Sequence, residues 1–191
     1  MFQGAIMEAF PLRTFMSLAA LCARRLPVKY PDPNLLRKEV MDTDLTDYSA
    51  RFLMYLKREA PDLSRAIQPA RDKEGRLTGS LLAKIEAPNR HVAAPLSIAT
   101  ENDEVTIGFD AYHTHLENWD SSESEESWFA KAISLVRDIM ADRVLIASWW
   151  LDEKWCGSQA IRSGVDPKRP AYVDTKATLR LRSWTGQKDH G

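Results

Sequence analysis

The sequence EVTIGFDAYHTH, residues 104–115, alternates apolar and polar side chains and places Val105, Ile107 and Phe109 on one side. A period of two predicts a β-strand that is buried on one face. The turn sequence ENDE, residues 101–104, comes just before it, so we expect a hairpin with a four-residue loop. This stretch is the clearest indication in the sequence that the chain forms a β-sheet.

Further strands surround this hairpin along the chain. The same alternation predicts one strand after Gly79 and another that begins at Leu96. The run VLIASWWL, residues 144–151, is apolar on both faces and is therefore expected to be a central strand. The last strand is predicted in TLRLRSW, residues 178–184, where leucines alternate with arginines.

One long amphipathic helix is predicted between these strands. Apolar residues from Trp128 to Met140 form a wide stripe at helical spacing, which predicts a helix of about 18 residues. Ser122 and Glu125 have the spacing of a capping box at its start. The order of elements predicts an α+β fold, with an antiparallel or mixed sheet of about five strands and the long helix packed on it.

The first seventy residues differ from the rest because their apolar residues follow helical spacing. An amphipathic helix is predicted over residues 12–26, and a second around residues 45–56 that ends at Pro61. The polar stretch RDKEGR, residues 71–76, is expected to be a boundary. The predicted organisation is thus an N-terminal helical segment, residues 1–70, before a compact α+β domain, residues 71–191. The helical segment either belongs to the core of that domain or forms a separate lobe.

Composition excludes several classes of protein. The chain has 191 residues, of which 44% are hydrophobic and 28% charged, as in globular proteins. A net charge of −1 gives no global basic field, so we expect no direct contact with nucleic acid. Two distant cysteines, Cys22 and Cys156, favour a reducing compartment, and therefore the cytoplasm. No run reaches the roughly 18 apolar residues of a membrane span, so we expect no membrane association.

The near-neutral total hides a chain with separated charges. Residues 91–130 contain no Lys or Arg and nine acidic residues, whereas residues 1–90 have 15 basic and 11 acidic residues. The last 61 residues again have a net charge of +4. Helix starts and turns favour acidic residues at each place separately. If the segment forms one acidic surface, its complementary partner is a basic protein.

A second feature is the pair of histidines in His113-Thr114-His115. In one continuous strand both imidazoles face the same side, and His-x-His can present two nitrogen ligands to a metal. In that strand they also share a face with Val105 and its apolar neighbours, which favours packing at the rim of the core. The metal hypothesis gives an alternative function: a small metal-dependent hydrolase, with Asp110 or Glu117 as general base.

Six tryptophans form a third feature. Trp128 and one of Trp149 and Trp150 are expected in the core, and others could be exposed anchors of an interface. The sequence contains no GxGxxG, P-loop, GxSxG or HExxH motif.

Residues 79–184 resemble small bacterial immunity proteins, the antidotes of polymorphic or contact-dependent growth inhibition toxins. The most specific element of this resemblance is the strand that ends in Tyr112, His113, Thr114 and His115. The resemblance implies a cytoplasmic protein without catalysis or cofactor, which binds one cognate toxin domain. Such a domain is often a nuclease with a basic cleft, and the acidic segment would cover that cleft.

The predicted partner-binding set combines the acidic segment with two aromatic anchors and the histidines. It consists of Asp110, Tyr112, His113, His115, Glu117, Trp119, Asp120, Glu123 and Glu126. No catalytic residue is expected, and a metal is expected only in the alternative hydrolase, where His113 and His115 would hold it.

Overall fold

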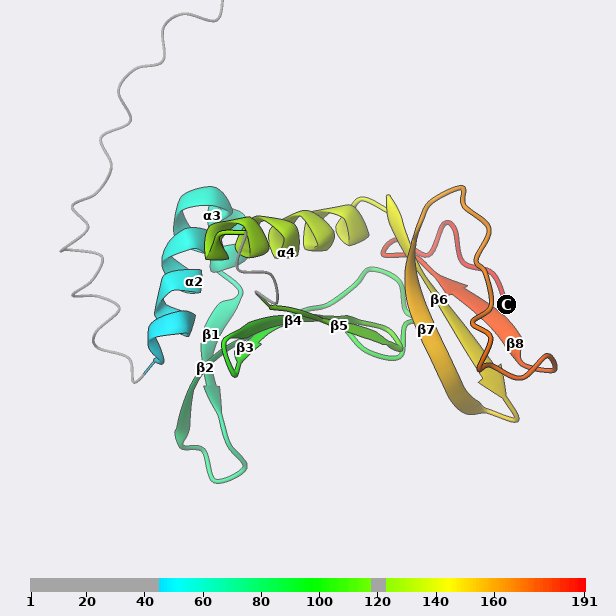
Figure 1. The fold of residues 1–191 in the computed structure, drawn as a ribbon, viewed down its shortest axis with the longest axis horizontal. Coiled ribbons are helices and arrows are strands. Elements are labelled where there is room, and N and C mark those ends of the chain that lie inside the picture. The colour runs from blue at the N-terminus through cyan, green and yellow to red at the C-terminus, as the bar shows by residue number, and fades with distance from the viewer. Residues whose placement is uncertain (1–44, 118–122) are drawn as a thin grey trace, which may run out of the picture.

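The computed structural model describes residues 45–117 and 123–191, and it confirms the α+β class. In this part of the chain, three helices accompany two antiparallel sheets (Figure 1). The predicted helix over residues 12–26 lies outside the described residues, as do Cys22, Trp119, Asp120 and Ser122.

The larger sheet is a five-stranded meander in which each strand pairs with the next. Its strands are β1 (Ile67–Arg71), β2 (Leu77–Ile85), β3 (Leu96–Glu101), β4 (Glu104–Phe109) and β5 (Tyr112–Leu116). The predicted alternation is confirmed, because Leu81, Ala83, Leu96, Ile98, Val105, Ile107 and Phe109 are all buried. Strand β1 corrects the prediction of helix at residues 67–70. Residues 72–76, which lie in the predicted boundary, form the turn of the β1–β2 hairpin.

Two tight turns differ from the predictions. Glu101 pairs with Glu104, so the β3–β4 loop has two residues, not four. Asn102 and Asp103 can close it because both adopt the left-handed conformation, at φ 50° and 60°. The stretch 104–115 is two strands, because the chain reverses at Asp110, which has φ 55°.

The smaller sheet has the order β7-β6-β8, with β6 (Val144–Leu151), β7 (Lys154–Arg162) and β8 (Thr178–Arg182). The prediction that residues 144–151 form a central strand is confirmed. The prediction of one sheet is wrong in this respect, because these strands form a sheet of their own. Asp152 and Glu153 close the β6–β7 hairpin, again with positive φ.

The helices are α2 (Asp47–Glu59), α3 (Pro61–Ser64) and α4 (Glu125–Met140). The side chain of Thr46 caps α2 by accepting the N–H of Ser49, and Ser124 caps α4 in the same way through Ser127. The cap of α4 is therefore Ser124 and not the predicted Ser122. Pro61 begins α3 at the position where its missing N–H costs nothing, while α2 ends just before it.

Helix α4 lies along one face of the larger sheet, with α2 beside its first turns (Figure 1). Phe129 of α4 is fully buried, and its ring contacts three aromatic rings of α2 edge-on. The centroid distances are 5.4 Å to Tyr48, 5.0 Å to Phe52 and 5.6 Å to Tyr55. This cluster joins both helices to the main core.

The two sheets meet where Trp184, just after β8, packs against Phe109 of β4 with 5.7 Å between ring centroids. Asn89 reinforces this junction by donating to the carbonyl of Ser183 at 2.8 Å. Ser158 of β7 donates to the carbonyl of Ala111 at 2.9 Å. The end of the β4–β5 hairpin is thereby fixed beside β7.

No helix among the described residues is both long enough and apolar enough to span a bilayer.

Replacing Phe129 tests the aromatic cluster. Phe129→Ala should lower the free energy of unfolding by about 3–5 kcal/mol, because it removes three ring contacts and leaves a cavity. Phe129→Leu fills most of the space and should cost less than half as much. Urea denaturation of both variants measures the difference. Equal losses would mean that the ring contacts, and not the filled volume, stabilise this site.

Candidate binding site

The predicted partner-binding residues lie at two ends of strand β5. Asp110, Tyr112 and His113 lie at the end next to the smaller sheet, whereas Glu117 lies just beyond the other end. A strand of this length spans roughly 17 Å, so these two groups cannot form one compact site. Glu123 and Glu126 lie at the start of α4, beside the Glu117 end.

The two histidines share one face, as predicted, and their ring centroids are 5.3 Å apart. That face is opposite to the core face, because the turn at Asp110 changes the register. His113 pairs with Gly108 and His115 with Thr106, so both imidazoles are exposed on the outer side of the sheet. The prediction that they share a face with Val105 and its apolar neighbours is therefore wrong.

His115 is already engaged within the sheet. Its Nδ1 lies 2.6 Å from a carboxylate oxygen of Glu104 and 3.1 Å from the hydroxyl of Thr106. Across residues 45–117 and 123–191, no group of three or more His, Cys, Asp and Glu side chains is arranged to hold a metal ion. A metal at this pair would need further ligands from water or from a substrate.

Basic side chains neutralise the acidic residues at the start of α4. Arg51 of α2 forms a two-pronged ion pair with Glu125, at 2.7 and 2.9 Å. Arg58 of α2 lies 3.2 Å from Glu126, and Lys131 lies 2.5 Å from Glu123. The charges that are separated along the sequence therefore meet where α2 packs against α4.

A hollow of about 300 Å³ beside these pairs keeps an acidic character. Its lining includes Tyr48, Arg51, Asp103, Glu117 and Glu125, together with Asn102 and Trp128, and we call it the acidic hollow. Within the described part of the chain, no hydrogen bond or ion pair engages the carboxylate of Asp103 or of Glu117. Sequence reasoning selected Glu117 but missed Asp103, which it treated only as a turn residue.

The pKa of Tyr48 reports the electrostatic field in this hollow. Burial of the phenol raises the pKa most, and the negative charges of Glu125, Asp103 and Glu104 raise it further. Arg51 alone among the named charges lowers it. Negative charge thus dominates at the wall of the acidic hollow in spite of the Arg51–Glu125 pair.

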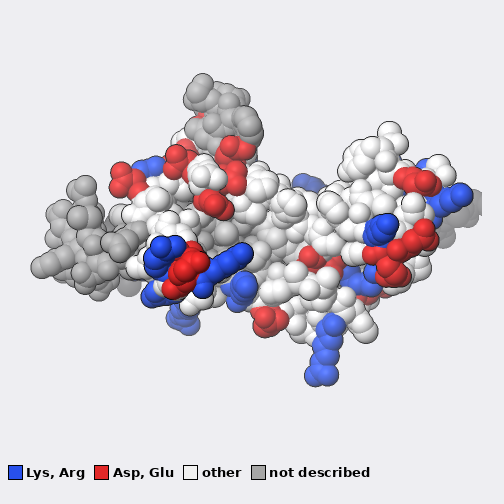
Figure 2. Space-filling view, turned by 90° about the horizontal axis from the view of Figure 1, so that it is seen from below, with Lys and Arg blue, Asp and Glu red and all other residues white. Residues whose placement is uncertain are grey.

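Acidic side chains also gather on the surface at this end of the molecule. Figure 2 shows several Asp and Glu side chains with little blue between them at the upper left. Over the rest of the face seen from below, red and blue side chains lie close to one another.

A second hollow, of about 510 Å³, lies where the β4–β5 turn meets the β6–β7 hairpin. Tyr112, His113, Trp150 and Trp155 line it, so we call it the aromatic hollow. Trp155 is 50% exposed, which fits the expectation that some tryptophans are surface anchors. Trp149 is buried as predicted. Trp128, in contrast, is only half-buried, with the ammonium of Lys131 3.9 Å from its ring centroid.

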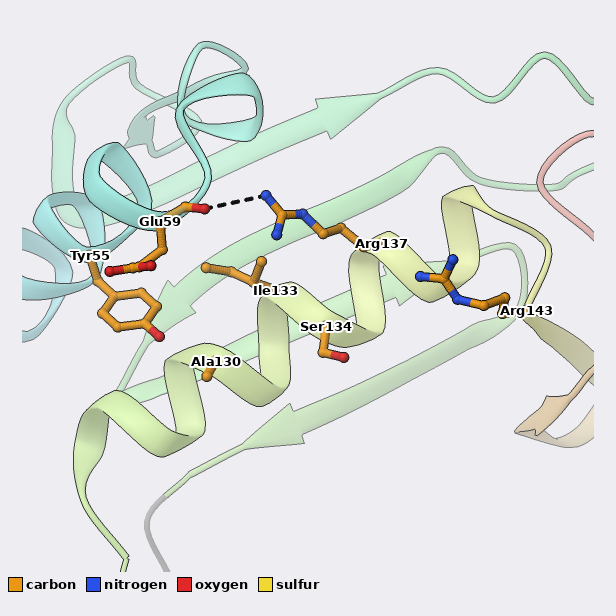
Figure 3. A pocket seen from close by; sticks show the side chains of 7 residues that line it. All are labelled: Tyr55, Glu59, Ala130, Ile133, Ser134, Arg137 and Arg143. Atoms are coloured by element: carbon orange, nitrogen blue, oxygen red, sulfur yellow. Dashed lines mark hydrogen bonds between the residues drawn. The ribbon is translucent and has the colours of Figure 1, made fainter. Parts of the chain in front are cut away.

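A third hollow, of about 250 Å³, lies between α2 and α4 and is drawn in Figure 3. Arg137 donates to the carbonyl of Glu59 at 3.3 Å and lies 3.6 Å from Asp62. Arg143 is bound by Asp138 at 2.7 Å. Both guanidinium groups are therefore engaged by the protein itself. The contacts of Arg137 join α4 to the end of α2 and to α3.

Comparisons with protein-family models, with curated proteins and with solved structures find no match to this chain.

The raised pKa of Tyr48 can be tested through the pH dependence of stability. Its folded-state pKa exceeds the unfolded value of about 10, so only the unfolded state ionises as the pH first rises above that value. The contribution of Tyr48 to stability is therefore fully present below about pH 10. The free energy of unfolding should fall as the pH rises above that value. Tyr48→Phe should make that fall shallower in urea denaturation at increasing pH. A remaining slope is expected from Tyr55, whose pKa is also raised. Identical slopes for both proteins would contradict this prediction.

Proposed function

We propose that this protein is an immunity protein, which binds and neutralises a cognate toxin domain through its acidic hollow. The observation that carries the proposal is the set of carboxylates around the hollow, of which those of Asp103 and Glu117 accept no ion pair among the described residues. A basic protein surface supplies the cationic partners that these two carboxylates lack.

The geometry supports a protein that binds the cleft of a nuclease in place of nucleic acid. A nuclease binds phosphates with a basic cleft, and exposed carboxylates compete for the same cationic side chains. Asp103 projects from a two-residue turn whose backbone is fixed by pairing on both sides. Its charge is therefore held in place before the partner arrives, which reduces the entropic cost of association.

The proposal includes a place and a mode of action. The protein would act in the cytoplasm of a bacterium that carries the toxin of a contact-dependent or other polymorphic system. It would make no direct contact with nucleic acid or membrane, and it would use no cofactor.

Partner capture from the native host tests this function. The full chain should retain one basic protein at equal stoichiometry through washes at moderate salt, and that protein should be toxic when it is expressed without this chain. Capture of no basic partner, or of one whose expression is harmless, would contradict the proposal.

Charge neutralisation in the acidic hollow tests the surface. The double variant Asp103→Asn and Glu117→Gln should weaken binding to the captured partner by about tenfold, or about 1.4 kcal/mol. Asn keeps the left-handed conformation that Asp103 requires, so the turn is preserved. Titration calorimetry at two salt concentrations measures the loss, which should shrink as salt rises.

The matched control removes the same two charges elsewhere. Asp166→Asn and Glu86→Gln change exposed carboxylates outside the acidic hollow. This control should bind as the unaltered protein does. Equal affinities for the two double variants would mean that the acidic hollow is not the interface.

One observation favours a second candidate, a metal-dependent hydrolase: the two imidazoles lie side by side on an exposed face. This function requires a stoichiometric metal ion. Elemental analysis of the purified full chain should then find one Zn, Mn or Fe per protein, and His113→Ala should remove it. A protein that binds none of these metals, even after each is added, would exclude this candidate.

A further inference from the structure

The aromatic hollow has walls from both sheets. One wall is the β4–β5 turn with Asp110 and Tyr112, and the other is the β6–β7 hairpin with Trp150 and Trp155. The hydrogen bond from Ser158 to the carbonyl of Ala111 holds these walls together. The hollow is therefore built by the sheet junction and does not depend on a single loop.

Gly108 lines this hollow and packs closely against Ser97. A Cβ at this position would come within 2.6 Å of the Ser97 hydroxyl oxygen, so a side chain cannot be added without moving Ser97. The neighbouring position across the strand pair is His113, whose imidazole stands at the edge. A larger residue at position 108 would therefore disturb the lining of the hollow.

The chemistry of the lining favours a cation. Trp150, Trp155 and Tyr112 contribute electron-rich rings, and none of the residues that line the hollow is Lys or Arg. The carboxylate of Asp110 accepts the N–H of Ala93 through Oδ1, at 2.7 Å. No hydrogen bond or ion pair in the described part of the chain engages its Oδ2, which can accept a donor from a ligand.

The same hairpin already holds one guanidinium against an indole. The Arg180 guanidinium carbon lies 4.6 Å from the ring centroid of Trp150, and its Nη2 is bound by Glu153 at 2.9 Å. This arrangement combines an aromatic ring with a carboxylate around one planar cation. Trp155 and Asp110 also bring an indole and a carboxylate to one place, since both line the aromatic hollow.

We propose that the aromatic hollow receives an arginine side chain of the protein partner, with the guanidinium over Trp155 and bonded to Asp110. This inference rests on the proposed function, because it gives the basic partner a second point of attachment in addition to the acidic hollow. It also explains why a tryptophan is left half exposed at this place.

Short peptides test the site without the partner. Acetyl-Gly-Arg-Gly-amide is titrated into the full chain while the indole N–H signals are followed by NMR. Acetyl-Gly-citrulline-Gly-amide has the same shape but no charge. The arginine peptide should produce saturable shifts with a dissociation constant on the order of millimolar, and the citrulline peptide should bind about fivefold or more weakly.

Three variants locate the binding. Trp155→Leu keeps an apolar side chain but removes the indole, and Asp110→Asn keeps the acceptor for Ala93 but removes the charge. Each should weaken the arginine peptide severalfold. Tyr172→Leu removes an aromatic ring that is 76% exposed outside the hollow, and should have no effect. Because the two test variants act independently, misfolding of one leaves the other as a test.

Two results would overturn the inference: equal affinity for the arginine and citrulline peptides, or no saturable shift at peptide concentrations of tens of millimolar. Neither result bears on partner capture, since no partner is present. Conversely, failed capture would overturn the proposed function, while the peptides would still decide whether the hollow binds a guanidinium.

Discussion

The packing of Phe129 against three rings of α2 is the contact on which the rest of the arrangement depends. It fixes α2 beside the first turns of α4, and only in that position can Arg51 and Arg58 reach the glutamates that begin α4. An apolar contact therefore determines the electrostatics of the surface. With α2 displaced, Glu125 and Glu126 would lose their arginine partners. The helix dipole would still stabilise their negative charge, but no basic side chain of α2 would balance it.

The acidic hollow contains the carboxylates that these ion pairs do not neutralise. Arg51 is paired with Glu125, and no described basic residue pairs with Asp103 or Glu117. The proposed partner would thus meet a small set of charges on a tight turn and a strand end, next to a half-buried tryptophan, Trp128. Such a mixture of fixed carboxylates and aromatic surface is typical of protein interfaces, in which charge selects the partner and buried apolar area provides affinity.

Much of the fold follows from periodicity, and the failures have physical causes. Strand β1 contains Pro69 and has no clear alternation, which edge strands tolerate. Strand β5 was merged with β4 because Asp110 turns the chain without a glycine, and this single error placed His113 on the wrong face. The acidic segment was visible as composition, but its pairing was not, since Arg51 and Glu125 are 74 positions apart.

The turns that close the hairpins have a consequence for how this surface can change. All the non-glycine residues with left-handed backbone in the described chain are Asn, Asp or Glu, among them Asn102, Asp103, Asp110 and Asp152. Asp and Asn both tolerate this conformation, so one can replace the other with the strand register intact. The fold and the surface charge are therefore decoupled at these tips. A lineage that must follow a changing partner can exchange charge for neutrality, one turn at a time, on an unchanged scaffold.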